Sequence, residues 1–192
     1  NYSVFKTDKI GVEYGADISC FSTFKLLGPE GIGCVVGNSE AIQSLKKENY
    51  SGGGQVQGHE ALDVLKGMIY VPVSQAISAK VGEEVCELLN KGAIEGVKEA
   101  NIVNAQSRVL IVELKDPLAE EVIEEATKLG ALPYPVGAES QYEFCPLFYR
   151  VSGTFRNADP TAEKRLIRIN PNRSGAKTIL RILKESIEKV KE

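Results

Sequence analysis

Short apolar runs bounded by glycine and proline stand at the beginning of the chain. Residues 16–21, ADISCF, and 31–37, GIGCVVG, have the length and composition of buried strands in an α/β sheet. The stretch that follows, NSEAIQSLKKE, has apolar residues at helical spacing, and Asn38 or Ser39 is placed to cap its N-terminus. We therefore expect two strands and a helix within the first fifty residues.

The pattern then changes twice. Residues 49–60, NYSGGGQVQGHE, combine three consecutive glycines with polar side chains, which predicts a loop. From Ala61 to about Ala100 the apolar positions recur at helical spacing, and Pro72 predicts a break or a kink. This length favours two helices or one long bent helix.

Beyond residue 100, short strand patterns mix with two amphipathic helices. Gly130 and Ser174 are placed to end the first of these helices and to cap the second. The expected strands are residues 108–115, 131–136, 147–153 and 165–171, and the expected helices are residues 117–130 and 174–192. Two helices packed on one face of such a sheet make a small α+β domain. We predict an α/β chain with one domain over residues 1–90 and this small domain over 91–192.

Composition narrows the class of protein. The 192 residues are 43% hydrophobic and 26% charged, with a formal net charge of -3, so charge gives no reason to bind nucleic acid or an anionic membrane. No apolar run is long enough to span a bilayer. The four cysteines have no metal-ligand spacing. We expect a cytoplasmic protein with buried, reduced thiols and no metal.

Lys25 is the residue whose surroundings most suggest chemistry. It stands between an apolar run and a Gly-Pro turn, flanked by Phe24 and Leu26 and preceded by the hydroxyls of Ser22 and Thr23. A free lysine amine has a pKa of about 10.4, so a nucleophilic lysine must be desolvated or placed beside another cation. An amine beside hydroxyl groups suits a phosphorylated aldehyde. A solvated loop lysine is the alternative that this local pattern leaves open.

Residues 22–33, STFKLLGPEGIG, resemble the lysine segment of fold-type I pyridoxal 5′-phosphate enzymes. The similarity is to the group of class V aminotransferases, cysteine desulfurases and selenocysteine synthase-like proteins. It implies that Lys25 binds the cofactor and is catalytic, and that Ser22, together with Thr23, binds the cofactor phosphate. Many members carry histidine before the lysine, where this chain has Phe24. The implied architecture is the end of a PLP-transferase-like large domain followed by a small α+β domain.

A second segment of the chain is similar to the same group. Residues 51–61, SGGGQVQGHEA, resemble the Gly-Gly-Gly-Gln segment that lies near the dimer interface and approaches the partner's cofactor phosphate. The resemblance implies a homodimer and makes Gln55, Gln57 and His59 candidate phosphate contacts. The usual Arg and Thr that follow this segment are absent here. For His59, an ordinary surface position remains the alternative.

A third similarity lies near the C-terminus. Residues 165–175, RLIRINPNRSG, resemble the class V segment whose arginine binds the substrate carboxylate. Strand alternation puts Ile167 and Ile169 on one face and Arg168 on the other, and a guanidinium matches a carboxylate in a two-bond fork. The resemblance implies a substrate contact for Arg168, with Arg173 as second candidate. A surface salt bridge is the alternative for either residue.

Two features limit the comparison. Cysteine desulfurases carry a nucleophilic cysteine at a similar distance after the lysine, but Cys145 lies among aromatic residues without a nearby cation, which favours a structural role. The group also binds the pyridine nitrogen with an aspartate well upstream of the lysine, and neither Asp8 nor Asp17 fits that position. We expect this chain to be the C-terminal half of a longer enzyme.

These observations predict a pyridoxal phosphate-dependent aminotransferase acting on an amino acid or a derivative. A lyase that catalyses β- or γ-elimination is the first alternative, because it needs the same lysine. A catalytically silent dimerisation or substrate domain is the second. A phosphate-binding module without covalent chemistry is a third, although the glycine-rich stretches lack the known nucleotide-binding fingerprints.

Overall fold

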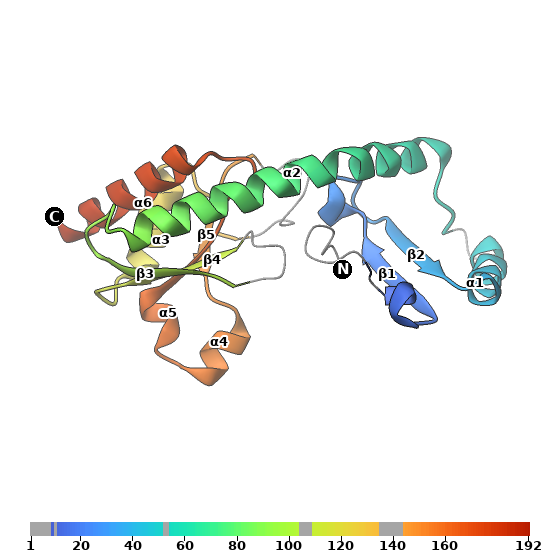
Figure 1. Cartoon of the computed structure of the whole chain (residues 1–192), viewed down its shortest axis with the longest axis horizontal. Coiled ribbons are helices and arrows are strands. Elements are labelled where there is room, and N and C mark those ends of the chain that lie inside the picture. The colour runs from blue at the N-terminus through green and yellow to red at the C-terminus, as the bar shows by residue number, and fades with distance from the viewer. Residues whose placement is uncertain (1–8, 10, 52–53, 104–108, 135–143) are drawn as a thin grey trace. The chain divides into compact units, whose positions relative to one another are not determined.

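The computed structural model describes residues 9, 11–51, 54–103, 109–134 and 144–192 (Figure 1). The described chain divides into two compact units, the first ending at Val73 and the second beginning at Ser74, within helix α2 (Gly58–Asn90). The helix ends at Asn90, where the sequence places the end of the first domain. That division into domains stays a prediction.

The first unit contains an antiparallel pair of strands and a helix. Strands β1 (Ile18–Ser22) and β2 (Gly33–Gly37) pair along their whole length, and α1 (Ser39–Ser51) follows. The side-chain oxygen of Asn38 accepts a hydrogen bond from the Ala41 N–H at 2.8 Å, so Asn38 caps this helix. Two short 3₁₀ helices complete the unit, η1 (Gly11–Tyr14) and η2 (Phe24–Leu26).

The two strands lie where the sequence predicts them, but the expectation that they are buried is wrong. Ile18, Val35 and Val36 are each more than 40% exposed. Among the described residues the sheet has two strands, so no further strand or covering layer shields both of its faces. Apolar composition alone could not reveal this.

Helix α2 is one continuous helix, with Pro72 inside it. The expected helical stretch to Ala100 is wrong at its C-terminal end, because β3 (Val97–Ile102) is a strand. Gly92 and Gly96 have φ of 84° and 95°, which ends helical geometry before the strand begins. Pairing of β3 with the neighbouring strand β4 (Leu110–Leu114) then overrides the helical propensity of this segment.

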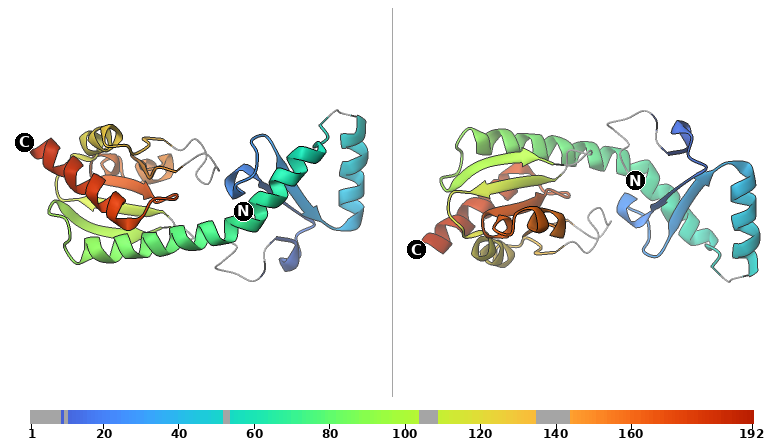
Figure 2. Two further views of the ribbon diagram at one scale, coloured as in Figure 1. Left: turned by 90° about the horizontal axis from the view of Figure 1, so that it is seen from above. Right: turned by 90° about the horizontal axis from the view of Figure 1, so that it is seen from below.

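The second unit is built on a four-stranded antiparallel sheet with the order β3-β4-β6-β5 (Figure 2). The other strands are β5 (Leu147–Arg150) and β6 (Leu166–Asn170). The C-terminal part of α2, α3 (Ala119–Lys128) and α6 (Ala176–Lys191) cover one face. Their apolar side chains and those of the inner strand positions form the main core. The two predicted helices, α3 and α6, thus lie on one face of the sheet as expected, and the end of α2 is a third helix on that face.

The opposite face of this sheet carries two short helices that the sequence did not predict. Helices α4 (Gly153–Ala158) and α5 (Ala162–Arg165) follow β5, and a small cluster of Ile111, Val151 and Ala162 packs beneath them. A cluster of this size leaves part of the face open for polar side chains. Strand β6 follows α5 in the chain, and its Arg168 is paired with Ile111 of β4. Arg168 therefore lies on this same face of the sheet.

Two predicted details of the second unit differ from the structure. Residues 131–136 were expected to form a strand, but Leu132 forms a single bridge with Leu147, and residues 135 and 136 lie outside the described part. Ser174 does not cap α6, because its hydroxyl donates to the Phe144 carbonyl at 3.1 Å.

No helix in the described ranges is long and apolar enough to cross a bilayer.

Candidate functional site

Lys25 lies in a tight turn that connects β1 to the loop before β2. It is the middle residue of η2 and its side chain is exposed. Leu27, two residues later, has a left-handed conformation with φ of 63°, which is unusual for a residue with a side chain. Such a conformation persists only where surrounding contacts hold it.

Thr23 closes the turn around Leu27 with four hydrogen bonds. Its carbonyl accepts hydrogen bonds from the N–H groups of Leu26 and Gly28, both at 2.9 Å. Its own N–H and its hydroxyl both donate to the Ile32 carbonyl, at 3.1 and 2.8 Å. Thr23 is 1% exposed, and its hydroxyl proton is already used in the hydrogen bond to Ile32 that closes the loop. The predicted contact between Thr23 and a phosphate stays a prediction.

Helix α2 supports the same turn from outside, through a residue that sequence reasoning missed. A methyl group added at Gly67 would lie 2.7 Å from the Leu27 carbonyl and 2.8 Å from the Leu26 oxygen. Only glycine allows the helix to approach the turn this closely. A glycine within a helix was the available signal in the sequence, because that residue costs stability there unless packing requires it.

We expect Gly67→Ala to destabilise the protein by about 1–3 kcal/mol, because the added methyl group collides with backbone that cannot move aside. This outcome opposes the helix propensity of alanine, which by itself favours the variant. Gly58→Ala is the matched control in the same helix, since a side chain there meets nothing within 4 Å. Urea unfolding of both variants measures the difference, and equal stabilities would show that the contact does not constrain the turn.

The other predicted cofactor contacts of the first unit are solvent-exposed. Ser22 is the last residue of β1, and His59 is the second residue of α2. Gln55 lies just before this helix, and its carbonyl accepts a hydrogen bond from the Gln57 side chain at 3.2 Å. The Gln57 N–H donates to the Glu60 carboxylate at 2.8 Å, which caps the helix. These predicted contacts, Ser22, Gln55, Gln57 and His59, are therefore all exposed to solvent.

Arg168 lies on the open face of β6, as the alternation of the strand predicts. Its neighbours Ile167 and Ile169 are fully buried in the main core on the other face. The Arg168 guanidinium lies 5.0 Å from the centre of the Tyr149 ring, which is its partner on β5. Its Nε atom is buried without a hydrogen-bond partner.

Arg165, close to it in sequence, shows what a structural arginine looks like in this fold. Arg165 donates to the Asp159 carboxylate at 2.6 Å and to the Glu113 carboxylate at 3.2 Å. Hydrogen bonds from Arg165 and Thr161 lower the pKa of Asp159 to about 2. Within the described ranges, by contrast, the Arg168 side chain has no hydrogen bond or ion pair. Among the described residues, no acidic side chain therefore pairs with its charge.

The remaining candidates have other surroundings. The Arg173 guanidinium lies 4.9 Å from the centre of the Phe144 ring.

The expectation of buried thiols is wrong, since Cys20 and Cys145 are exposed. Cys34 and Cys86 are partly buried, and this burial raises the pKa of each thiol. Among the described residues, no group of three metal-ligating side chains occurs.

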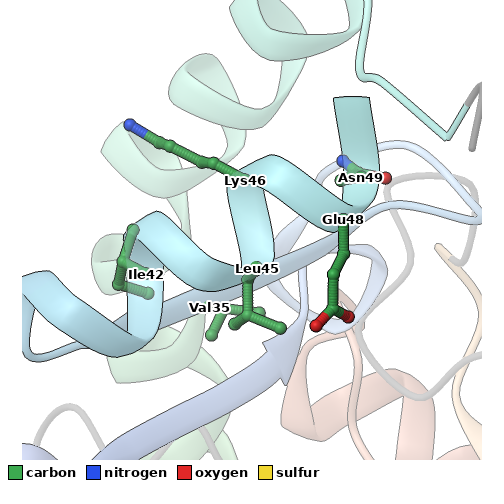
Figure 3. A pocket seen from close by; sticks show the side chains of 6 residues that line it. All are labelled: Val35, Ile42, Leu45, Lys46, Glu48 and Asn49. Carbon is green, nitrogen blue, oxygen red and sulfur yellow. The ribbon is translucent and has the colours of Figure 1, made fainter. Parts of the chain in front are cut away.

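A groove of about 580 Å³ lies between β2 and α1 (Figure 3). Val35, Ile42 and Leu45 give it an apolar lining, and its polar lining residues are Lys46, Glu48 and Asn49. None of the site residues predicted from the sequence lines it. The groove therefore adds no group to the chemistry of the Lys25 turn.

Two family models match the chain, one in each half. The aminotransferase class V model matches residues 8–66, which contain the Lys25 turn. This match confirms the resemblance of the lysine segment to class V aminotransferases. The model of the YhfS-like C-terminal domain matches residues 83–183, which contain Arg168. The uncharacterized protein YhfS of Escherichia coli K12 is 58% identical over 190 residues, which make up 99% of this chain and 53% of that protein. The chain thus spans about half the length of this relative.

Solved structures agree with the expected fold. The pyridoxal-5′-phosphate dependent protein YhfS from Escherichia coli matches 97% of this chain and 52% of its own, with 56% identity and a TM-score of 0.92. Cystathionine gamma-lyase from yeast matches 93% of this chain and 51% of its own, with 16% identity and a TM-score of 0.67. Cystathionine gamma synthase from Xanthomonas oryzae pv. oryzae matches 94% of this chain and 52% of its own, with 16% identity and a TM-score of 0.66.

The last two similarities concern the fold alone, and they confirm the predicted α/β class with the C-terminal architecture of fold-type I enzymes. The match to the YhfS-like C-terminal domain covers more than half of the residues. From this match we conclude that the chain belongs to the YhfS-like family of proteins.

Proposed function

We propose that this chain belongs to a pyridoxal phosphate-dependent enzyme that transaminates an amino acid or a derivative of one. The observation that carries the proposal is the Lys25 turn, in which an exposed amine is presented by a backbone fixed through Thr23 and Gly67. Its occurrence in the segment similar to class V aminotransferases supports the assignment, as does the cofactor dependence of the YhfS relative.

The residues of the turn fit the chemistry of this cofactor. Pyridoxal phosphate supplies an aldehyde for an amine and an electron sink for charge that develops at the substrate Cα. Lys25 is the amine that would bind it. The phosphate needs hydrogen-bond donors, and the exposed hydroxyl of Ser22 is three residues from the lysine. Gln55 and His59 are further proposed donors, offered by the N-terminal end of α2.

Arg168 is proposed to bind the substrate carboxylate. It is a partly buried cation that no acidic side chain of the described chain neutralises, in contrast to Arg165. The Arg168 guanidinium lies over the Tyr149 ring, which would restrict its orientation. A guanidinium held in this way can donate two parallel hydrogen bonds to the two oxygens of one carboxylate. Arg173 is the second candidate. Substrates with a free carboxylate are therefore the expected class.

The proposed catalytic step is a proton transfer by Lys25. With cofactor and substrate bound, the Lys25 amine would take the proton from the substrate Cα as a positioned base and would later give a proton back as an acid. A rigid turn favours this role, because transfer requires the amine to be held within hydrogen-bond reach of the reacting carbon. The fixed position of the Thr23–Gly28 backbone meets this requirement.

Elimination is the second candidate, favoured by the fold shared with cystathionine gamma-lyase and cystathionine gamma synthase. The two reactions differ in their need for a second substrate. Transamination needs a keto acid to accept the amino group, whereas elimination releases ammonium without one. Ammonium formed from amino acids in the absence of any keto acid would favour the lyase.

Borohydride reduction tests the assignment of the cofactor. We expect reduction of the natural full-length protein with pyridoxal phosphate to leave a permanent label on one peptide, with Lys25 as the modified residue. Lys47→Ala, a change of an exposed lysine on α1, should leave the labelling unchanged. A label on another lysine would contradict the site, and no label would favour a silent domain or a phosphate-binding module.

A further inference from the structure

Asn170, the last residue of β6, is a polar side chain buried inside the second unit. It is 0% exposed, and its pairing partner on β5 is the fully buried Leu147. The Nδ2 atom of its amide is buried and makes no hydrogen bond within the described ranges. Such a donor is rare in folded proteins, because its lost hydrogen bond to water is not replaced. It therefore requires an explanation.

The orientation of this amide follows from its other end. The Asn170 side-chain oxygen accepts a hydrogen bond from the Asn172 N–H at 3.1 Å. Exchanging the oxygen and the nitrogen of the amide would set two donors against each other, so the oxygen faces Asn172. Asn172 is itself fixed, because its side chain donates to the Cys145 carbonyl at 2.8 Å. The Asn170 NH₂ group is thus held in place before any ligand binds.

Arg168 has the same deficiency on the same face of the sheet. Strand alternation puts Asn170 on the face of Arg168, while Ile167 and Ile169 belong to the main core on the other face. The buried Nε of Arg168 also has no hydrogen-bond partner in the described part of the chain. Because unsatisfied buried groups are few in a native protein, two of them at successive positions of one face indicate one missing acceptor.

Asn90 shows how this unit satisfies an asparagine with a structural role. Its Nδ2 donates to the Ala100 carbonyl, and its side-chain oxygen accepts from the Ala100 N–H, both at 2.8 Å. Asn170 makes only the second kind of bond. One asparagine is therefore bonded through both ends of its amide, whereas the other keeps an unused donor beside an arginine that also has one.

The chemistry of these two donors indicates the acceptor that fits them. The Arg168 guanidinium carries one positive charge, and the Asn170 amide adds a donor without adding charge. A carboxylate matches this pair, because it has one negative charge and two oxygens that accept several hydrogen bonds. A group with two negative charges would keep one of them unbalanced by these residues.

We propose that Asn170 donates from its Nδ2 atom to the substrate carboxylate that Arg168 binds. This inference rests on the proposed function, which assigns the carboxylate to Arg168. A donor from a second side chain fixes the carboxylate more narrowly than the guanidinium alone, and with it the adjoining Cα whose proton is transferred. Asn170 is thereby a specificity residue, which favours substrates with a free carboxylate over amines that lack one.

Spectral titration of the natural full-length protein with pyridoxal phosphate tests this contact. The probes are the amino acid whose Cα hydrogen exchanges fastest from a mixture of the common amino acids, and the amine in which hydrogen replaces its carboxylate. We expect Asn170→Ala to raise the dissociation constant of the amino acid by about 10- to 150-fold, the contribution of one hydrogen bond to a charged group. The constant of the amine should not change.

Two further variants separate this inference from the proposed function. Asn90→Ala, the matched control, should leave the preference for the amino acid over the amine unchanged. In Arg168→Ala the carboxylate has lost its charged partner, so adding Asn170→Ala should weaken binding much less than it does alone. An undiminished effect would place the two donors on different groups and contradict the inference.

The remaining outcomes are equally decisive. If Arg168→Ala weakens the amino acid selectively and Asn170→Ala does not, this inference is overturned and the proposed function stands. If Arg168→Ala has no selective effect, or no amino acid exchanges, both fail together. Asn170→Leu, which has a similar shape without a donor, replaces Asn170→Ala if that variant does not fold. Equal weakening of the amino acid and the amine would show that Asn170 serves only the fold.

Discussion

Lys25→Ala is expected to slow exchange of the substrate Cα hydrogen by about 10²- to 10⁴-fold, the usual contribution of a positioned acid or base. The variant keeps the backbone of the turn, since the hydrogen bonds of Thr23 do not involve the lysine side chain. Loss of rate would therefore report the missing amine. Nuclear magnetic resonance of amino acids incubated with the full-length protein in deuterium oxide follows this exchange.

The same variant has a spectroscopic consequence. Binding of the cofactor to a lysine amine gives an absorbance band at about 420 nm, and we expect Lys25→Ala to lack it. Lys47→Ala should show both the band and normal exchange. If Lys25→Ala retains more than a tenth of the exchange rate or an unchanged band, another amine performs this chemistry.

Arg168→Ala is expected to reduce kcat/KM for the amino-acid substrate by about 10²- to 10⁴-fold, mostly through KM. Hydrogen bonds to a charged group contribute about 1.5–3 kcal/mol each, and the guanidinium offers a fork of two. Arg168→Lys should recover little of this loss, because an ammonium group cannot reproduce the fork or stack on Tyr149. Steady-state kinetics of the three proteins measures the effect.

A substrate analogue separates binding from folding. An amino-acid amide, which lacks the carboxylate, should be a poor substrate for the natural protein and equally poor for Arg168→Ala. Arg181→Ala, which removes an exposed arginine paired with Glu185 on α6, should behave like the natural protein. If Arg168→Ala impairs the amide as strongly as the free acid, the side chain supports the fold and not the substrate.

Local patterns predicted those parts of the structure that local forces determine. The turn at Lys25 follows from two apolar runs separated by a Gly-Pro turn, and the side on which Arg168 lies follows from strand alternation. Strand β3 was missed because its residues favour a helix by themselves, and only pairing with β4 makes them extended. The end of α2 was consequently placed ten residues too late.

Contacts between distant residues were beyond sequence patterns. The chain contains several glycines, and nothing local shows that Gly67 is the one that touches the lysine turn. Similarly, Arg165 and Arg168 stand three residues apart in the same segment, yet one is bound by two carboxylates and the other by none in the described chain. That difference arises from where α5 and β4 bring Asp159 and Glu113, which requires the folded structure.

The contact between Gly67 and Leu27 also has an evolutionary meaning. Leu27 holds a conformation that costs a residue with a side chain about 1–2 kcal/mol, and its carbonyl occupies the space where a side chain of residue 67 would lie. A mutation at either position changes the conditions at the other. Selection on the lysine turn should therefore act on the two positions jointly, although forty residues separate them and neither carries a reactive group.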